Sequence, residues 1–197
     1  MRSIVFTAVM LLNLASAAFA QGISAPPNVI KTCESCHGPG GNGPTPSTPR
    51  LNGQLAAYTV NRLRELTDLT RNSVRATMAM HDNAKMNDTL RAAVADYFSR
   101  QTPTPAQPQA GKLTAIGQRL YANGDAAIQL PACQSCHGAD AEGQGNAPRL
   151  AGQHRDYLRA QLWNFNLVMR DNPVMHPNAM KLNSDQIESL VAWLGAD

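Results

Sequence analysis

Two short motifs with the pattern Cys-x-x-Cys-His-Gly constrain this chain more than any other feature of its sequence. The first spans Cys33–Gly38 and the second spans Cys133–Gly138, and together they hold all 4 cysteines of the 197 residues. Cysteine and histidine at this spacing can bind zinc, can exchange thiols with disulfides, or can carry a covalently attached haem. The rest of the sequence decides among these three chemistries.

The first twenty residues have the order of a secretory signal peptide. Arg2 provides an early positive charge, an apolar run follows, and the segment ends in Ala18-Phe19-Ala20. The apolar run is short for a membrane span, and an uncleaved anchor is the alternative. We therefore predict that the chain is exported and cleaved after Ala20, so that the mature protein begins at Gln21.

The mature chain is predicted to contain two copies of one domain. Three blocks recur in the same order in both halves: 48–58 with 147–157, 80–84 with 175–179, and 88–98 with 184–194. The stretch between the copies, QTPTPAQPQA, is rich in proline and has no large apolar residue, which is typical of an extended linker. Blocks this far apart indicate a duplicated domain rather than a short repeat. The predicted division is a signal peptide at 1–20, a first domain at 21–100, a linker at 101–110 and a second domain at 111–197.

Both domains are predicted to be helical. Apolar residues recur every three or four positions, which predicts helices at 54–69, 88–98, 113–122, 153–169 and 184–194. Asn183 or Ser184 can cap the last of these helices. No segment reads as a strand, so we predict an all-α fold. Where the second half begins with a helix, the first half has only a short segment at 25–32, interrupted by Pro26 and Pro27.

The histidine beside each cysteine pair favours haem over zinc and over thiol exchange. A zinc ribbon places its second cysteine pair roughly 15–20 residues after the first, whereas here a whole domain and a linker intervene. A thiol-exchange motif needs a strand–helix fold, and no strand is predicted. Cys-x-x-Cys-His is, by contrast, the attachment signature of c-type haem. We therefore predict two covalently bound haem c groups, attached through Cys33, Cys36, Cys133 and Cys136, with His37 and His137 as proximal iron ligands.

The ligand on the other face of each iron decides between an electron carrier and an iron that binds small molecules. Met80 and Met175 occupy matching positions ahead of the last helix of each half. Because a thioether favours Fe(II) and raises the reduction potential, we predict that these two methionines complete the coordination of the irons. Met78, Met86 and Met180 are nearby alternatives. Met78 competes most directly, because the first copy is one residue shorter after this block.

Histidines outside the haem motifs offer a further alternative. His81 and His176 follow the two predicted methionine ligands, and their ligation would give bis-histidine haems of lower potential. Otherwise we expect them at the surface beside the haem. His154 has no counterpart in the first half, and we expect it to be an exposed residue of a helix.

The block that reads Pro-Arg-Leu in both halves supplies candidate neighbours for the haem. The carbonyl oxygens of Pro49 and Pro148 can accept the Nδ1–H of the proximal histidines, or these are simply loop prolines before a helix. Arg50 and Arg149 can pair with haem propionates, or they are solvated.

Taken together, these motifs resemble the cytochrome c4 family, which consists of dihaem class I cytochromes c of the bacterial periplasm. The two CxxCHG motifs, the PxLxGQxxxY block of each half, the methionine before the last helix and the Pro-rich linker carry the resemblance. It spans essentially the whole mature chain and implies two tandem class I cytochrome c domains, placed face to face, with His/Met ligation of both irons. It further implies a periplasmic electron carrier that delivers electrons to a haem–copper terminal oxidase. The short first segment of the first domain departs from the family pattern, as does the altered start of the last helix in each copy.

The expected function is electron transfer rather than catalysis. The expected partners are redox proteins: an upstream quinol-oxidising complex or dehydrogenase, and a downstream terminal oxidase. The chain has 17 basic and 14 acidic residues and no basic cluster interleaved with aromatics, so we expect no nucleic-acid partner. We expect a monomer, for which peripheral membrane association is an option. The alternatives are a dihaem peroxidase-like enzyme and a cytochrome subunit of a periplasmic dehydrogenase.

Overall fold

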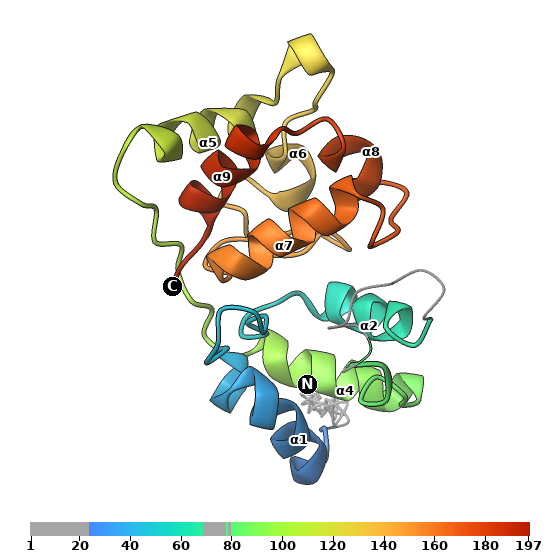
Figure 1. Cartoon of the computed structure of the whole chain (residues 1–197). Coiled ribbons are helices and arrows are strands. Elements are labelled where there is room, and N and C mark those ends of the chain that lie inside the picture. Colours follow the sequence, from blue (N-terminus) through green and yellow to red (C-terminus); the bar gives the residue numbers. More distant parts are fainter. Residues whose placement is uncertain (1–23, 69–77, 79) are drawn as a thin grey trace, which may run out of the picture.

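The chain folds into two helical halves stacked on each other, with the linker running along one side (Figure 1). This computed structural model describes residues 24–68, 78 and 80–197. Within these residues there are helices and isolated bridges but no strand, so the predicted all-α class is confirmed. None of the helices in these ranges is long and apolar enough to span a membrane. The cleavage site predicted after Ala20 lies outside the described residues.

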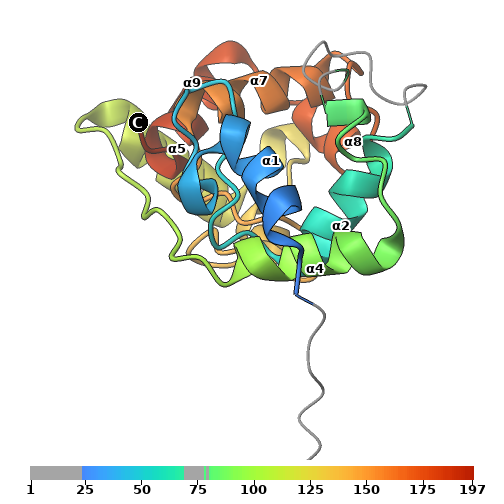
Figure 2. The same ribbon diagram turned by 90° about the horizontal axis from the view of Figure 1, so that it is seen from below.

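The first half begins with a helix that is longer and more regular than the sequence predicted. Its described elements are α1 (Pro27–His37), the 3-10 turn η1 (Pro39–Gly41), α2 (Ala56–Glu65) and α4 (Asp88–Ser99), and Figure 2 shows them from below. Pro27 does not interrupt α1 but begins it, because the fixed φ of proline suits the first helical position and its missing N–H is not needed there. The helix therefore has 11 residues and carries the first Cys-x-x-Cys-His motif at its end.

The second half is organised around two helices that cross in close contact. Its elements are α5 (Lys112–Asn123), the 3-10 turn η3 (Ala126–Ile128), α6 (Gln134–His137), α7 (Arg155–Asn166), α8 (Met175–Ala179) and α9 (Ser184–Leu194). Helix α9 has the predicted bounds, and Asn183 caps it in a reciprocal capping box with Gln186. A Cβ added at Gly117 of α5 would lie 1.9 Å from the carbonyl oxygen of Ser189 in α9. The backbones of α5 and α9 therefore touch where the helices cross.

Each half has an apolar core of its own. In the first half, Ile30 of α1 and Leu63 of α2 pack in one cluster with Val94 and Phe98 of α4. In the second half, the cluster includes residues of α5, α7 and α9: Leu120, Tyr121, Leu158, Ile187, Leu190, Val191 and Leu194. The two clusters have no residue in common, so each half buries its apolar side chains independently of the other.

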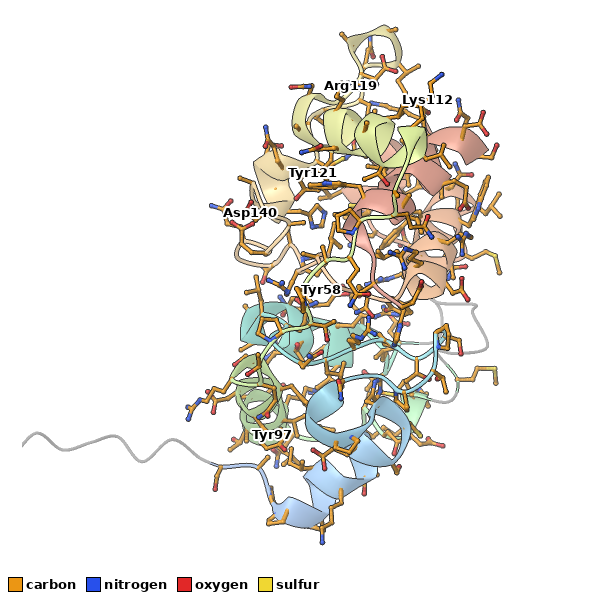
Figure 3. All side chains as sticks on the ribbon, turned by 90° about the vertical axis from the view of Figure 1, so that its left-hand side faces the viewer. Tyr58, Tyr97, Lys112, Arg119, Tyr121 and Asp140 are labelled. Carbon is orange, nitrogen blue, oxygen red and sulfur yellow. The ribbon has the colours of Figure 1, made fainter. Side chains whose placement is uncertain are left out.

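The two halves fasten the segment around the haem motif in different ways (Figure 3). Tyr121 of α5 is 1% exposed, and its hydroxyl donates to the carbonyl oxygen of Gly138 at 2.6 Å. Its ring packs against Trp193 of α9, with the ring centroids 4.6 Å apart. In the first half, the hydroxyl of Tyr97 in α4 donates to the carboxylate of Glu34 in α1 at 2.9 Å. In both halves a tyrosine hydroxyl therefore holds this segment, through Gly138 in the second half and through Glu34 in the first.

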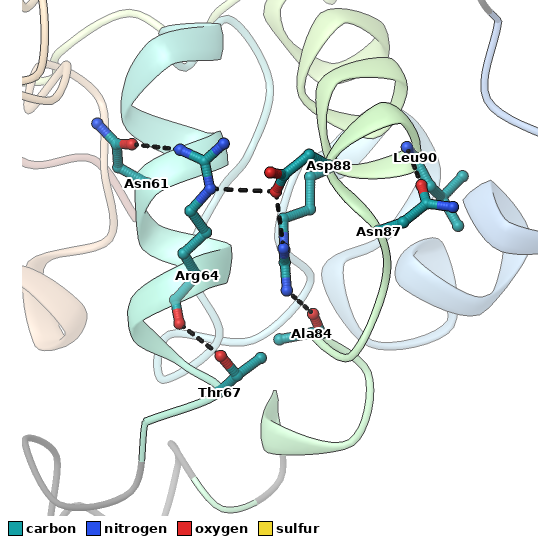
Figure 4. Close-up of polar contacts among 8 residues, drawn as sticks. Asn61, Arg64, Thr67, Ala84, Asn87, Asp88 and Leu90 are labelled. Carbon is teal, nitrogen blue, oxygen red and sulfur yellow. Dashed lines mark hydrogen bonds and ion pairs between the residues drawn. The ribbon is translucent and has the colours of Figure 1, made fainter.

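An ion pair joins α2 to α4 in the first half (Figure 4). The carboxylate of Asp88, at the start of α4, lies 3.1 Å from Nε of Arg64 and 2.9 Å from Nη1 of Arg91. Arg91 also donates to the carbonyl oxygen of Ala84 at 3.3 Å. In the second half, the fully buried Ile187 stands in the place of Arg91. An ion pair also joins the corresponding helices of the second half, where Nε of Arg159 in α7 lies 2.6 Å from the carboxylate of Glu188 in α9.

Two glutamines join the halves at a seam between the PRLxGQ blocks, close to Tyr58 of α2 (Figure 3). Oε1 of Gln153 accepts the backbone N–H of Arg50 at 2.8 Å, and its Nε2 donates to the carbonyl oxygen of Arg50 at 3.0 Å. Oε1 of Gln54 accepts the N–H of Arg149 at 2.9 Å, and its Nε2 donates to the carbonyl oxygen of Arg149 at 3.0 Å. Each side-chain amide therefore pairs with the backbone of the other half, in an arrangement with approximate two-fold symmetry.

His154 belongs to this seam, and the prediction that it is an exposed helix residue is wrong. Its side chain is 4% exposed, and its Nε2–H donates to the carbonyl oxygen of Gly43 in the first half at 2.8 Å. Its Nδ1 is buried and has no hydrogen-bond partner among the described residues. Burial lowers the pKa of His154, which favours the neutral ring. The prediction fails because the surface that covers His154 comes from the other half, which no local sequence pattern reveals.

The linker is hydrogen-bonded to both halves. The side-chain amide of Asn52 in the first half donates to the carbonyl oxygen of Thr102 at 2.8 Å. The backbone N–H of Gln107 donates to the carbonyl oxygen of Gly195, just beyond α9, at 3.0 Å. The linker therefore lies against the folded halves instead of crossing open solvent between them.

Candidate haem sites

The first proximal side is built at the end of α1. His37 is the last residue of this helix and is 5% exposed. Its Nδ1 lies 2.8 Å from the carbonyl oxygen of Pro49, so the Nδ1–H donates and Nε2 is left for a metal ion. Burial lowers the pKa of His37, which favours the neutral ring that iron binds.

The second proximal side repeats this geometry at the end of α6. His137 is 7% exposed, and its Nδ1 lies 2.9 Å from the carbonyl oxygen of Pro148. Burial again lowers the pKa of the ring. The predicted contact between a proline carbonyl and the Nδ1–H of the proximal histidine is therefore present in both halves. It fixes the same tautomer twice, with Nε2 free in each ring.

The four cysteines beside these histidines form no disulfide bond. Cys36 and Cys136 are exposed, whereas Cys33 and Cys133 are partly buried. Burial raises the pKa of Cys33 and raises the pKa of Cys133 to about 11, the opposite of what a thiol-exchange cysteine needs. In the described part of the chain, no three or more His, Cys, Asp or Glu side chains form a group that could hold a metal ion. The raised pKa values of Cys33 and Cys133 disfavour the thiol-exchange alternative.

The arginines that follow the two prolines have different surroundings. Nε of Arg149 is buried without a hydrogen-bond partner, and burial lowers the pKa of this guanidinium group. An anion such as a haem propionate would satisfy it, so the residues of the second site fit a haem. Arg50 is used at the seam instead, where Nη1 donates to the carbonyl oxygen of Gly152 at 2.8 Å and Nη2 donates to that of Asp197 at 3.1 Å.

The candidate methionines for the second axial position differ in their exposure. Met80 is partly buried and packs against the apolar core of the first half, as does Met86. Met78 is 66% exposed, which leaves it poorly placed to reach a buried iron. Met175 is partly buried at the start of α8, whereas Met180 is 58% exposed. Met80, Met86 and Met175 are therefore the least exposed of the five candidate methionines.

The histidines next to these methionines are tied to helix ends. Nδ1 of His81 lies 3.2 Å from the carbonyl oxygen of Leu66 at the end of α2. Nδ1 of His176 lies 2.7 Å from the carbonyl oxygen of Phe165 in the last turn of α7. Each ring N–H thus satisfies a carbonyl group at a helix end, where helices leave such groups unpaired. Sequence reasoning did not reveal this tie between the methionine segment and the preceding helix.

The sequence also gave no direct sign of the role of Gln54 and Gln153. Both precede a helix, which suggests only a residue near a helix start. The available signal was that the same glutamine recurs beside the Pro-Arg-Leu motif in both halves. Repetition alone does not say that the two copies face each other.

The chain matches two family models. Residues 114–196 match the family described as Cytochrome c, and residues 28–98 match the family described as Cytochrome C oxidase, cbb3-type, subunit III. The two matches correspond to the two halves of the structure, and each contains one haem motif.

Curated relatives and a solved structure resemble the chain along most of its length. Cytochrome c4 of Azotobacter vinelandii is 32% identical, and the match covers 98% of both chains. The thiosulfate dehydrogenase electron acceptor of Thiomonas intermedia is 35% identical over 91% of this chain and 84% of the relative. The solved structure of Acidithiobacillus ferrooxidans cytochrome c4 has a TM-score of 0.76 and 32% identity, covering 83% of this chain and 98% of that one.

Proposed function

Because this chain belongs to the cytochrome c4 family, we propose that it carries electrons between redox proteins of the periplasm. As a member of that family it is an electron-transfer protein with two covalently bound haem c groups. Bound haem iron supplies reversible one-electron exchange between Fe(II) and Fe(III). The protein supplies the axial ligands, their hydrogen bonds and a largely buried setting, which together determine the potential at which this exchange occurs.

One repeated observation carries the assignment of the sites. In each half a buried, neutral histidine beside two thiols donates its Nδ1–H to a proline carbonyl oxygen, at 2.8 Å for His37 and 2.9 Å for His137. This bond holds the ring and leaves Nε2 available, which is the arrangement that a metal-bound histidine requires. His37 and His137 are therefore the proposed proximal ligands.

The cysteines are the proposed attachment residues. With haem bound, each cysteine would hold it through a thioether bond to one vinyl group, which forms by addition of the S–H across the double bond and needs no oxidant. Cys33 and Cys36 serve the first site, and Cys133 and Cys136 serve the second. Attachment through two bonds keeps the cofactor on an exported chain and leaves no thiol to oxidise.

Methionine ligation can be tested one domain at a time. Met80→Ala and Met175→Ala are each expected to remove about half of the methionine–iron charge-transfer absorption of the oxidised protein, because each opens one of two irons. The reduced variants are expected to bind carbon monoxide at one haem, whereas the reduced wild type should bind none. Optical titration with carbon monoxide measures both effects.

Neighbouring methionines provide matched controls for this test. Met78→Ala and Met180→Ala should leave the absorption unchanged, because both side chains are largely exposed. If Met86→Ala loses half of the charge-transfer absorption and Met80→Ala keeps all of it, the ligand of the first iron is Met86. Carbon monoxide binding or peroxide turnover by the wild type would contradict the carrier function and favour the peroxidase-like alternative.

The proposed location is the periplasm, reached by an export signal that is cleaved after Ala20. The proposed donors are a quinol-oxidising complex or a dehydrogenase, and the proposed acceptor is a haem–copper terminal oxidase. A dehydrogenase as donor gains specific support from the relative named as a thiosulfate dehydrogenase electron acceptor, which is 35% identical to this chain. In that case the chain accepts electrons from a periplasmic enzyme instead of from the quinol pool.

Stopped-flow reduction distinguishes the two donors. The haem-loaded protein is mixed with thiosulfate and a catalytic amount of thiosulfate dehydrogenase, or with a quinol-oxidising complex and its quinol. Rapid reduction in the first mixture alone would support the dehydrogenase as donor. Reduction by the second mixture alone would assign the chain to the quinol branch. Subsequent oxidation by a haem–copper oxidase tests the proposed acceptor.

A further inference from the structure

The peptide group between Pro49 and Arg50 is hydrogen-bonded on both sides. Its carbonyl oxygen accepts the Nδ1–H of His37 at 2.8 Å, and its N–H donates to Oε1 of Gln153 at 2.8 Å. His37 belongs to the first haem site, whereas Gln153 belongs to the second half. Two hydrogen bonds and one peptide group therefore connect a proposed iron ligand with the opposite domain.

The equivalent connection exists in the second half. The peptide group between Pro148 and Arg149 accepts the Nδ1–H of His137 at 2.9 Å through its carbonyl oxygen. Its N–H donates to Oε1 of Gln54, in the first half, at 2.9 Å. The molecule thus has two such relays, each made of a histidine, a peptide group and a glutamine, and each crosses the seam.

The glutamines in these relays are fixed in orientation. Gln54 and Gln153 are 7% and 8% exposed. In each, Nε2 donates to an arginine carbonyl oxygen of the other half, so Oε1 must be the atom that faces the arginine N–H. Each Oε1 also accepts the N–H of the next residue, Leu55 or His154, at 3.0 Å. The network therefore determines which end of each amide takes part in the relay.

A relay of this kind changes the electronic character of the histidine. A peptide group whose N–H donates to a good acceptor is more polarised, so its carbonyl oxygen accepts more strongly. A stronger acceptor for the Nδ1–H gives the imidazole more anionic character and makes it a more basic ligand. A more basic ligand stabilises Fe(III) relative to Fe(II), which lowers the reduction potential.

We propose that each domain adjusts the reduction potential of the haem in the other domain. Gln153 acts on the first haem through the Pro49–Arg50 peptide group and His37. Gln54 acts on the second haem through the corresponding peptide group and His137. Both glutamines act through other residues and are therefore positioning residues. This inference rests on the proposed ligation of the irons by the two histidines.

The test replaces each glutamine by methionine, which has a similar length but offers no comparable acceptor. In the haem-loaded, full-length protein, Gln153→Met is expected to raise the potential of the first haem and to leave that of the second unchanged. Gln54→Met is expected to do the reverse. Potentiometric titration followed by NMR, with the haem resonances assigned to their domains, measures both potentials in each variant. The crossed pattern is diagnostic, because a local structural defect would affect the haem of the mutated domain.

A second readout does not depend on the potentials. In the reduced protein, the Nδ1–H proton of His37 is expected to move upfield in Gln153→Met, because its hydrogen bond weakens, while that of His137 stays in place. Asn61→Ala is the control, since it removes another bond across the seam, from Asn61 to Asn146 at 2.8 Å, without touching either relay. This control should leave both potentials and both protons unchanged.

Three results would overturn the inference: a shift confined to the haem of the mutated domain, equal shifts of both haems, or no shift in either glutamine variant. If both haems keep their wild-type potentials in the two glutamine variants, this inference fails, but the proposed carrier function stands. If the ring signals of His37 and His137 in the wild type are insensitive to the oxidation state of iron, the proposed ligation fails, and the inference fails with it.

Discussion

Replacing Gly117 with alanine is expected to destabilise the second domain by about 3 kcal/mol, the upper end of what overpacking usually costs. An alanine Cβ would lie 1.9 Å from the carbonyl oxygen of Ser189 and 3.0 Å from the backbone nitrogen of Leu190. These are backbone atoms of α9, so no side chain can turn aside and the helices must separate. Glycine to alanine inside a helix normally gains only about 0.5–1 kcal/mol, so the clash dominates.

The two tryptophans of the chain make this effect measurable. Trp163 and Trp193 both lie in the second half, so their fluorescence reports the unfolding of that domain alone. In a denaturant titration, Gly117→Ala should unfold at a lower midpoint than the wild type. Gln118→Ala changes an exposed neighbour on the same helix and should unfold like the wild type. Equal midpoints for the two variants would show that α5 and α9 can separate at little cost.

Acidification from pH 7 to about pH 5 is expected to loosen the seam. Protonating the buried ring of His154 while the seam is closed costs free energy. Its Nδ1 is buried without a partner, so a protonated ring would have a donor with no acceptor. Burial is the main cause of the lowered pKa of His154; the positive charge of Arg50 lowers it further, whereas the hydrogen bond to Gly43 and the carboxylates of Asp197 and Asp156 act in the opposite direction. A buried charge that lacks a partner is among the more costly features of a protein interior.

The direction of the pH dependence follows from the lowered pKa of His154, which burial causes. When the seam opens, the ring titrates near its ordinary pKa of about 6.5, so the open form takes up a proton first. The stabilisation from His154 is therefore complete above about pH 6.5 and is lost as the pH falls toward the lower pKa of the closed form.

Amide hydrogen exchange at the seam measures this loosening. The N–H groups of Arg50 and Arg149 donate to the seam glutamines, so their protection should fall between pH 7 and about pH 5 after correction for the intrinsic rate. In the repeat, Leu55 of the first half corresponds to His154, so His154→Leu introduces the residue that the first half already has. The variant loses the contact with Gly43 but should show a nearly flat pH profile. An unchanged profile in this variant would assign the acid response to another group.

The helical architecture and the hydrogen bonds of the candidate proximal histidines could be predicted from the sequence because their determinants are local. The periodic apolar residues of 184–194 gave a helix that the structure shows with the same bounds, capped by Asn183. The contact from His37 to Pro49 was also within reach, because residues only 12 positions apart form it and the second half repeats it. Short-range chemistry of this kind leaves a pattern in the sequence.

The features that were missed depend on position within an element or on contact between the halves. Pro27 reads as an interruption because a proline inside a helix breaks it, yet at the first helical position the same ring is favourable. The burial of His154 and the pairing of Gln54 with Arg149 depend on a surface contributed by the other copy. A repeat shows that two blocks are alike, but it does not show that they bind each other.

The hydrogen bonds along the linker have a consequence for kinetics. Asn52 fastens one end of the linker to the first half, and Gln107 fastens it beyond α9 in the second. Together with the paired glutamines, these bonds hold the domains in contact, so that the domains need not diffuse together before they exchange electrons. Electron exchange between the halves should therefore need no diffusional encounter, and its rate should not depend on solvent viscosity. Only the meetings with external donors and acceptors would slow down in a viscous medium.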